Sequence, residues 1–378
     1  MYKSNEIKEV HLEITQRCQA ACPMCARNQE GGDDNPHLTD AELSLEDCIT
    51  IFPTTFIKQL NKMYMCGNYG DPIVAKDTLD VFAYFRSNNS NMNLSMNTNG
   101  GAKDQNWWKE LALVLGSKGV VTFSVDGLRD TNHIYRRNVN WDIVERSMRT
   151  FISAGGRARW DYLVFKHNEH QVDEAEAFAQ ELGFESFHAK RSSRVFTNGR
   201  LGKDRKGEVT LYEQPVTEKW RNPNIRPGYE QPQPVLISQL NAKPGKAPPT
   251  SDRNKTLNTV EVSCKVKQEK SVYVSAEGHI LPCCWVAGEM YNRWWDPNPY
   301  TAQTWRHIKL SGGLAPINAK LHGIDGVLDN AKLFNTIEKS WKLPTVGLGK
   351  LDVCCRICDK ANDHFATQWI DKKDETSV

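Results

Sequence analysis

Short apolar runs alternate with longer amphipathic stretches through the first half of the chain. The short runs are rich in β-branched and apolar residues, which predicts strands at residues 9–15, 62–68, 91–100, 120–127, 157–165 and 186–192. The stretches between them have helical periodicity, which predicts helices near residues 40–60, 76–88, 104–116, 140–154 and 171–182. Strands that alternate with helices in this way predict βα units, in which the helices pack outside a parallel sheet. Six such units predict an α/β fold, namely a partial (βα)6 barrel of the TIM type with its chemistry in the loops at the C-terminal strand ends.

The pattern changes after the sixth predicted strand. Residues 194–260 contain eight prolines among polar residues, which predicts an extended connection. Residues 271–285 alternate as a hairpin with its turn at AEGH, whereas residues 286–350 have no clear period and remain unassigned. Residues 357–373 have the pattern of a helix that starts just after the last cysteines. We therefore expect a barrel at 1–193, a connection at 194–260 and a small cysteine-rich domain at 261–378.

Charge and hydropathy exclude some classes of protein. Lys and Arg total 48 against 46 for Asp and Glu, so the net charge of +2 creates no field that would attract nucleic acid or an anionic membrane. No apolar run approaches the roughly 18 residues of a membrane span, and the N-terminus lacks a signal-peptide pattern. We therefore expect a cytoplasmic protein. Its eleven cysteines are then expected to be metal ligands or catalytic thiols rather than disulfides, since the cytosol keeps thiols reduced.

The first cysteine cluster, Cys18, Cys22 and Cys25, follows the first predicted strand on a loop. Three thiolates can bind three irons of a cubane and leave the fourth iron without a protein ligand. The CxxxCxxC spacing after the first barrel strand resembles the radical S-adenosylmethionine (SAM) superfamily. That resemblance implies a [4Fe-4S] cluster that cleaves SAM to a 5′-deoxyadenosyl radical. The alternatives are free thiols or a structural zinc site, which would need a distant fourth ligand such as His37.

The same resemblance implies roles for polar residues at other strand ends. The GNYGDP stretch stands where the family has a motif that receives the methionyl amino group, and its candidates are Gly67, Asn68, Gly70 and Asp71. Ser124 and Arg136 are expected to hold the SAM carboxylate, with Arg137 as an adjacent alternative. The remaining candidates are Met24 beside the adenine, in place of the family's usual aromatic residue, and Asn97, Asn99 and Asp126 at the ribose or substrate. Turn capping is the alternative for each polar residue.

The C-terminal cysteines have a second recognisable spacing. Cys264 and Cys283 bracket the predicted hairpin, and Cys355 and Cys358 form a CxxC pair. Four thiolates complete a cluster with no open iron. The arrangement resembles the Twitch and SPASM domains of radical SAM enzymes, and six cysteines imply one auxiliary [4Fe-4S] cluster rather than two. A zinc ribbon is the alternative.

Two neighbouring cysteines compete for these ligand positions. Cys284 follows Cys283 and Cys354 precedes Cys355, and adjacent side chains on an extended strand point to opposite faces. The spacing from Gly278 favours Cys283, and the CxxC spacing favours Cys355.

These observations predict an oxidoreductase-like radical SAM enzyme that acts on a peptide or a small molecule and receives electrons from a flavodoxin or ferredoxin. The barrel begins near residue 9, which leaves little room for a fused peptide-recognition domain and lowers the peptide option. The alternatives are a non-catalytic iron–sulfur or zinc-binding protein, and an activase that installs a glycyl radical, for which no ferredoxin-like insertion is seen. The sequence identifies no catalytic residue; Cys66 and Tyr69 qualify only if their side chains face the barrel interior.

Overall fold

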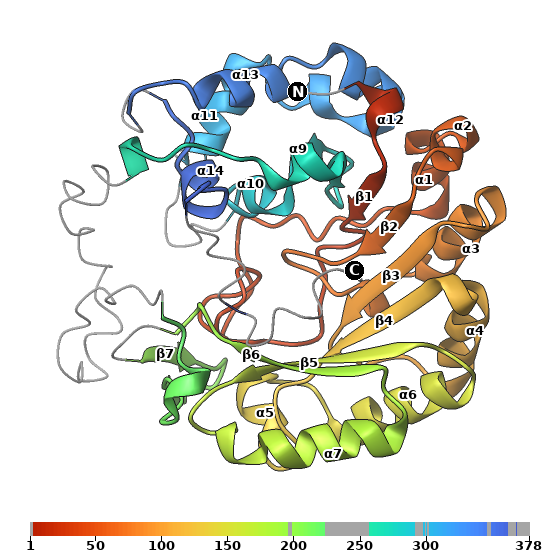
Figure 1. Cartoon of the computed structure of the whole chain (residues 1–378), viewed down its shortest axis with the longest axis vertical. Coiled ribbons are helices and arrows are strands. Elements are labelled where there is room, and N and C mark those ends of the chain that lie inside the picture. Colours follow the sequence, from red (N-terminus) through yellow and green to blue (C-terminus); the bar gives the residue numbers. More distant parts are fainter. Residues whose placement is uncertain are drawn as a thin grey trace.

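The computed structural model describes residues 3–195, 199–223, 257–291, 298, 300, 302–345, 349–361 and 368. A sheet of six successive parallel strands forms its centre (Figure 1). These strands are β1 (Glu9–Leu12), β2 (Lys62–Met65), β3 (Asn93–Thr98), β4 (Gly119–Ser124), β5 (Ala158–Val164) and β6 (Ser186–Arg191). Each strand pairs with the next one along the chain. The α/β class and the order of a partial barrel are therefore confirmed.

Helices cover the outer face of this sheet (Figure 1). They are α1 (Leu45–Ile51), α2 (Thr54–Lys58), α3 (Thr78–Asn88), α4 (Gln105–Leu115), α6 (Trp141–Ser153) and α7 (Val172–Leu182). Shorter elements lie between them: η1 (Ser4–Glu6), η2 (Pro72–Val74), η3 (Gly116–Lys118), α5 (Asn132–Tyr135) and η4 (Glu169–Gln171). The first predicted helix is two helices, because Pro53 cannot donate a helical hydrogen bond and keeps Phe52 out of helical geometry.

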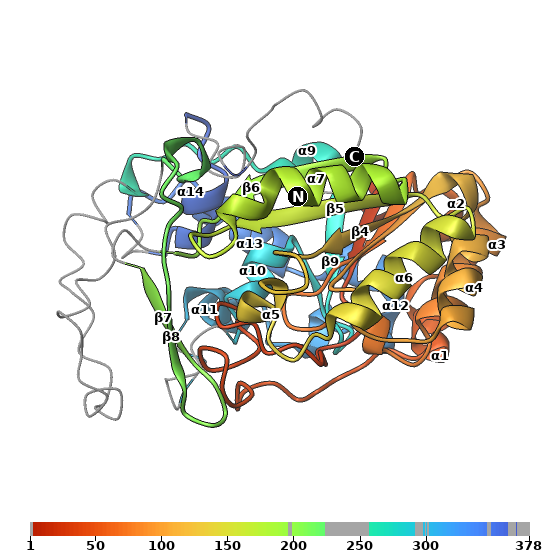
Figure 2. The same cartoon turned by 90° about the horizontal axis from the view of Figure 1, so that it is seen from below.

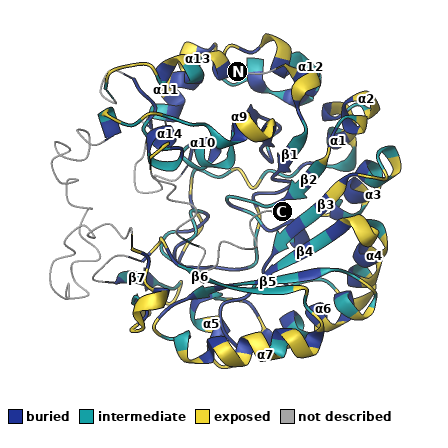
Figure 3. Ribbon diagram, in the orientation of Figure 1, coloured by how far each residue is buried: buried dark blue, intermediate teal, exposed yellow. Residues whose placement is uncertain are grey.

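Burial alternates along the central strands (Figure 3). Phe123 and Trp160 are fully buried on the side of the helices, and Phe123 stacks on Trp108 of α4 at 5.4 Å between ring centroids. The intervening residues, such as Ser124 and Asp161, are only partly buried and face the barrel interior. The outer face therefore holds the core, and the inner face carries polar side chains.

The C-terminal part of the chain joins the same sheet. β9 (Ser271–Val274) pairs parallel to β1, and β10 (Ile280–Leu281) pairs antiparallel to β9. The predicted hairpin is thus confirmed. It extends the barrel sheet beside β1, although the sequence analysis assigned it to a separate domain.

Short helices precede and follow this hairpin along the chain, at the β1 end of the sheet (Figure 1). The helices of this region are α9 (Lys265–Glu269), α10 (Cys284–Gly288), α11 (Gln303–Leu310), η8 (Ala315–Ile317), α12 (Ala319–Asn330), α13 (Leu333–Ser340) and α14 (Asp352–Ile357). The start of the final helix was predicted wrongly, because α14, which carries two cysteines, ends at Ile357 and residues 358–361 are not helical. The rest of the predicted helix lies outside the described residues, apart from 358–361 and 368.

The connection after β6 contains a hairpin that the sequence analysis missed. β7 (Arg200–Lys203) and β8 (Val209–Tyr212) are antiparallel, and η5 (Glu218–Trp220) follows them. Figure 2 shows the hairpin projecting from the end of the sheet. The prolines that predicted an extended connection begin only at Pro215, and residues 224–256 lie outside the described residues. Across the described residues, no helix has both the length and the apolar character needed to cross a membrane.

Candidate active site

The first three cysteines lie on the loop that leaves the C-terminal end of β1. Cys25 donates its backbone N–H to the carbonyl of Cys22 at 3.0 Å, so the two residues share a turn. Cys18 and Cys25 lie within electrostatic reach of each other. Burial raises the pKa of the Cys22 thiol to about 11. Burial likewise raises the pKa of Cys18, with Asp71 and the other two thiols adding to the effect. These thiols therefore ionise most readily when a bound cation takes the place of their protons.

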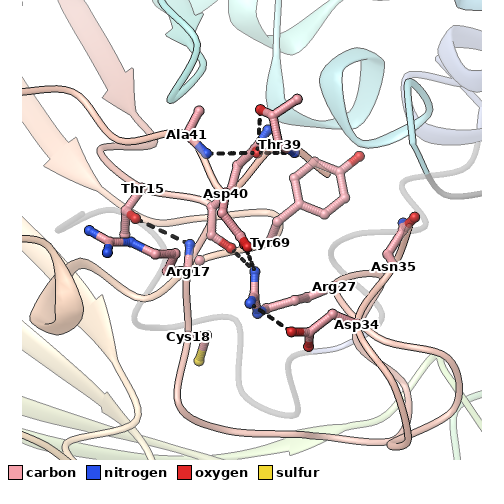
Figure 4. A network of polar contacts seen from close by, with 12 residues as sticks. Thr15, Arg17, Cys18, Arg27, Asp34, Asn35, Thr39, Asp40, Ala41 and Tyr69 are labelled. Atoms are coloured by element: carbon pink, nitrogen blue, oxygen red, sulfur yellow. Dashed lines mark hydrogen bonds and ion pairs between the residues drawn. The ribbon is translucent and has the colours of Figure 1, made fainter. Parts of the chain in front are cut away.

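Arg27 holds the two ends of this loop together (Figure 4). Its buried guanidinium donates to the carbonyl of Gln16, to Asp40 at 3.1 Å and to Asp34 at 3.3 Å. These contacts fix the chain on both sides of the cysteines, so the three thiols are held by more than the loop's own turns.

Several N–H groups point at the cysteine sulfurs. Asn99, just beyond β3, donates its side-chain amide to the sulfur of Cys18 at 3.6 Å, and the backbone of Ala20 does so at 3.4 Å. Nη1 of Arg136 lies 4.0 Å from the sulfur of Cys22. Donors of this kind stabilise the negative charge of thiolate ligands in iron–sulfur sites.

Arg136 is oriented by a buried carboxylate. Nε of Arg136 donates to Asp126 at 2.6 Å, and the other oxygen of Asp126 accepts the backbone N–H of Leu163 at 2.7 Å. Asp126 is fully buried, and burial raises its pKa despite the neighbouring guanidinium. Both oxygens of Asp126 are thus engaged within the protein, and the pair aims the arginine at Cys22.

The GNYGDP loop packs tightly against the cysteine loop. A Cβ atom on Gly70 would lie 1.9 Å from the carbonyl oxygen of Thr15, and one on Gly67 would lie 2.3 Å from that of Gly70. Asp71 is buried and accepts the backbone N–H of Asn99 at 2.8 Å. The two glycines are therefore needed for close approach of two backbones, as expected where a ligand is gripped by main-chain groups.

The other predicted cofactor contacts are distributed around this core. Asn97 and Ser124 lie half-buried on the inner face of their strands, whereas Met24 is buried with the hydrophobic core. The side chain of Asn68 donates to the carbonyl of Cys284 at 2.9 Å, in the C-terminal part of the chain, rather than to the loop of Cys18, Cys22 and Cys25. Whether these residues contact a cofactor stays a prediction.

Comparison with known families identifies this site. The sequence profile described as the radical SAM superfamily matches residues 12–179, which run from the last residue of β1 through most of α7. Residues 12–179 form a radical SAM domain. The cofactors that this domain implies are SAM and a [4Fe-4S] cluster.

Individual relatives of the radical SAM domain are distant. GTP 3′,8-cyclase from Desulforamulus reducens is 26% identical over 152 residues, which cover 38% of this chain and 44% of that protein. The chain therefore spans less than half the length of this curated relative. Among solved structures, Streptococcus suis SuiB bound to S-adenosylmethionine is 15% identical, with a TM-score of 0.43 over 77% of this chain and 66% of that chain. BtrN in complex with AdoMet and 2-DOIA is 12% identical, with a TM-score of 0.42 over 97% and 98% of the two chains.

The polar groups around the thiols of the radical SAM domain can be compared with the needs of a cluster. Three thiolates on one loop can bind three irons of a cubane. The N–H donors around Cys18 and the guanidinium beside Cys22 suit an anionic iron–sulfur cluster.

A second group of cysteines lies outside the radical SAM domain. Cys264, Cys283, Cys354 and Cys358 line one cavity, with tryptophan and aliphatic side chains around them. A hydrogen bond to Cys358 and burial both raise the pKa of the Cys264 thiol. Cys284, by contrast, lies within reach of Glu13 and is directed toward the barrel.

The structure brings Cys354 into this cavity in place of the predicted Cys355. The sequence analysis chose Cys355 by assuming a CxxC pair, but residues 352–357 form α14. Cys358 comes directly after α14 as its C-cap and donates its backbone N–H to the carbonyl of Cys354 at 2.9 Å, which keeps the two residues close together. Cys355 points elsewhere and packs on Leu257.

Sequence reasoning also missed Glu13, which is 1% exposed just after β1. Its carboxylate accepts the backbone N–H groups of Tyr69 at 2.7 Å and Gly70 at 3.2 Å, and the hydroxyl of Tyr273. A signal was available in the alternation of polar residues at positions 9, 11 and 13, which share the inner face of the strand.

Proposed function

We propose that this chain is a radical SAM enzyme that abstracts hydrogen from a peptide or small-molecule substrate. The observation that carries the proposal is the three-cysteine loop, whose thiols receive N–H groups from Asn99 and Arg136 at the C-terminal ends of the strands. When bound, the cluster and SAM supply a reductive cleavage of the sulfonium that yields a 5′-deoxyadenosyl radical. The inner face of a parallel barrel shields such a species from solvent.

The roles of individual residues follow from their contacts. Cys18, Cys22 and Cys25 hold three irons. The backbone of residues 67–71 is tight enough to present carbonyls to the SAM amino group, and Asp71 braces it against Asn99. Arg136, oriented by Asp126, and Ser124 take the SAM carboxylate. In this proposal the adenosine lies against Met24, Asn97 and Asn99.

We assign one auxiliary [4Fe-4S] cluster to Cys264, Cys283, Cys354 and Cys358. Support comes from the shared cavity and from the apolar side chains that enclose it. Four protein ligands leave no open iron, so this cluster suits electron transfer with a substrate radical or with a flavodoxin or ferredoxin donor. Loss of a hydrogen atom and then of one electron from the substrate is a net oxidation, hence the oxidoreductase assignment.

The substrate is proposed only by class. The inner face near β5 and β6 carries Asp161, which is bonded to both His188 and Lys190 at about 15% side-chain exposure. These charged and polar side chains on the inner face suit a polar substrate. The relative named GTP 3′,8-cyclase favours a small molecule, and a peptide remains the other class.

The free state of all eleven cysteines is compatible with the cytoplasmic location expected from the sequence.

Anaerobic reconstitution tests this proposal directly. About eight irons per chain are expected, and the Cys18→Ala/Cys22→Ala/Cys25→Ala variant should retain about four. The wild type should form 5′-deoxyadenosine from SAM and dithionite, and the triple variant should not. Clusters that form without any SAM cleavage would instead support a non-catalytic iron–sulfur protein.

A further inference from the structure

We propose that the loop of residues 67–71 couples the SAM site to the auxiliary cluster, so that filling the C-terminal cysteines tightens SAM binding. The inference rests on the proposed function and deepens it. It concerns a link between two sites that contact the same short loop from opposite sides.

Side chains of the loop bind the helix that follows Cys283. Asn68 donates to the carbonyl of Cys284 at 2.9 Å, and the hydroxyl of Tyr69 donates to the carbonyl of Gly288 at 2.9 Å. These acceptors are the first and last residues of α10. Both ends of α10 are thus tied to the loop that is expected to receive the SAM amino group.

The backbone of the loop is also held by a contact that begins on strand β9. Tyr273 of β9 donates its hydroxyl to Glu13, and Glu13 accepts the N–H groups of Tyr69 and Gly70. Asn68 also donates to the Tyr273 hydroxyl at 3.3 Å. The position of β9 therefore influences the same peptide groups that α10 holds by their side chains.

The other end of the loop contacts the radical SAM cysteines. Asp71 donates its backbone N–H to the carbonyl of Arg17 at 3.0 Å. It also accepts the N–H of Asn99, whose amide reaches the sulfur of Cys18. A continuous series of hydrogen bonds thus runs from α10 through residues 68–71 to the first cluster.

The dependence on the auxiliary cluster follows from the size of α10. The helix has five residues, and Cys283 precedes them as the N-cap. The Cys283 side chain makes no capping hydrogen bond. Helices this short have little stability of their own, so their position is set by tertiary contacts. Ligation of Cys283 fixes the start of α10, and α10 in turn fixes Asn68 and Tyr69. Coupling between the two sites is then reciprocal, since each ligand favours the same ordered loop.

Anaerobic equilibrium dialysis of SAM tests the coupling. The Cys264→Ala/Cys358→Ala variant should keep about four irons, lose the auxiliary cluster and leave α10 unaltered in sequence. Its Kd for SAM should rise about tenfold, within the usual range of allosteric coupling. In an Asn68→Ala/Tyr69→Phe background, removing the auxiliary cluster should raise the Kd less than about twofold. Tyr84→Phe is the matched control for Tyr69→Phe. It also removes a tyrosine hydroxyl, but the hydroxyl of Tyr84 donates to the carbonyl of Phe52, away from the site.

An unchanged Kd after loss of the auxiliary cluster would overturn the coupling, as would the same tenfold rise in the Asn68→Ala/Tyr69→Phe background. A wild type that binds no SAM with both clusters present would overturn the proposed function itself. Hydrogen exchange gives a second readout on folded protein. The amides of Tyr69 and Gly70 should exchange faster without the auxiliary cluster, and equal rates would contradict the proposal.

Discussion

At the scale of the residue, buried charges organise the site. Glu13 accepts three hydrogen bonds and Asp126 accepts two, and neither carboxylate reaches solvent. Asp126 was predicted from its place after a strand, but as a ribose or substrate contact, and the structure pairs it with Arg136. Glu13 was not predicted: the alternation at positions 9, 11 and 13 places it on the inner face of the strand, but nothing in the sequence indicates which loop it holds. Contacts between distant loops are set by the fold and cannot be read from either segment alone.

Glu13 should make stability depend on pH. Burial raises its pKa from 4.5 to about 7, against the hydrogen bonds that lower it. Protonation therefore favours the folded state, and this contribution is complete below about pH 4.5 and is lost as the pH rises through about 7. Between about pH 6 and pH 8.5, the wild type should lose about 1.4 kcal/mol of unfolding free energy relative to Glu13→Gln. Anaerobic urea unfolding of both proteins measures this difference, and a difference independent of pH would contradict it.

The Arg136 and Asp126 pair should behave as a unit. Arg136→Gln leaves Asp126 buried without its cation and should cost about 3 kcal/mol of stability. Adding Asp126→Asn should recover more than half of that loss, because no buried charge then remains. Thermal unfolding of Arg136→Gln, Asp126→Asn and the double variant tests this expectation. Arg129→Gln, whose partner Asp142 is exposed, is the control and should change stability by less than about 1 kcal/mol. If the stability losses of the two single variants simply add in the double variant, the pairing is ruled out.

At the scale of the element, periodicity predicted the barrel well and the C-terminal part poorly. Strands and helices from residue 9 to 191 repeat one unit, so each hydrophobic pattern supports its neighbours. The described residues between 286 and 350 form short helices that depend on tertiary contacts, and they leave no clear period. The choice of Cys355 rested on the CxxC spacing, whereas α14 brings Cys354 to the cavity, and which of the two is a ligand stays a prediction.

The two adjacent cysteines of α14 provide a matched comparison. Cys354→Ala removes a thiol from the cavity, and the reconstituted protein should hold about four irons rather than eight. Cys355→Ala removes a thiol that packs on Leu257, and about eight irons should remain. Iron and sulfide analysis of both variants decides between them, and the opposite result would restore the CxxC assignment.

At the scale of the whole molecule, the C-terminal strand completes the barrel sheet. β1 lies between β2 and β9, so its backbone is hydrogen-bonded on both sides. The partners β1 and β9 are 262 positions apart in the chain, as in the pair Glu9 and Ser271, and no local pattern could have indicated that residues 271–274 pair with residues 9–12. The arrangement means that the C-terminal cysteines and the radical SAM domain share one folded body.

Removal of the C-terminal part should therefore destabilise the barrel. A chain ending at residue 260 would expose the edge of β1 and would lack Tyr273, the hydroxyl donor to the buried Glu13. We expect it to aggregate or to unfold at a much lower temperature than the full chain. Size-exclusion chromatography with circular dichroism provides the measurement. A monomeric truncated chain with an unchanged melting temperature would contradict the shared sheet.

The central claim is that Cys18, Cys22 and Cys25 support cleavage of SAM. The most direct measurement is the 5′-deoxyadenosine formed anaerobically from SAM and dithionite by the reconstituted wild type and by Cys22→Ala. The wild type should produce it repeatedly, and Cys22→Ala, with its auxiliary iron retained, should produce none above the background without protein. Equal amounts from the two proteins, or none from a wild type with about eight irons, would contradict the account.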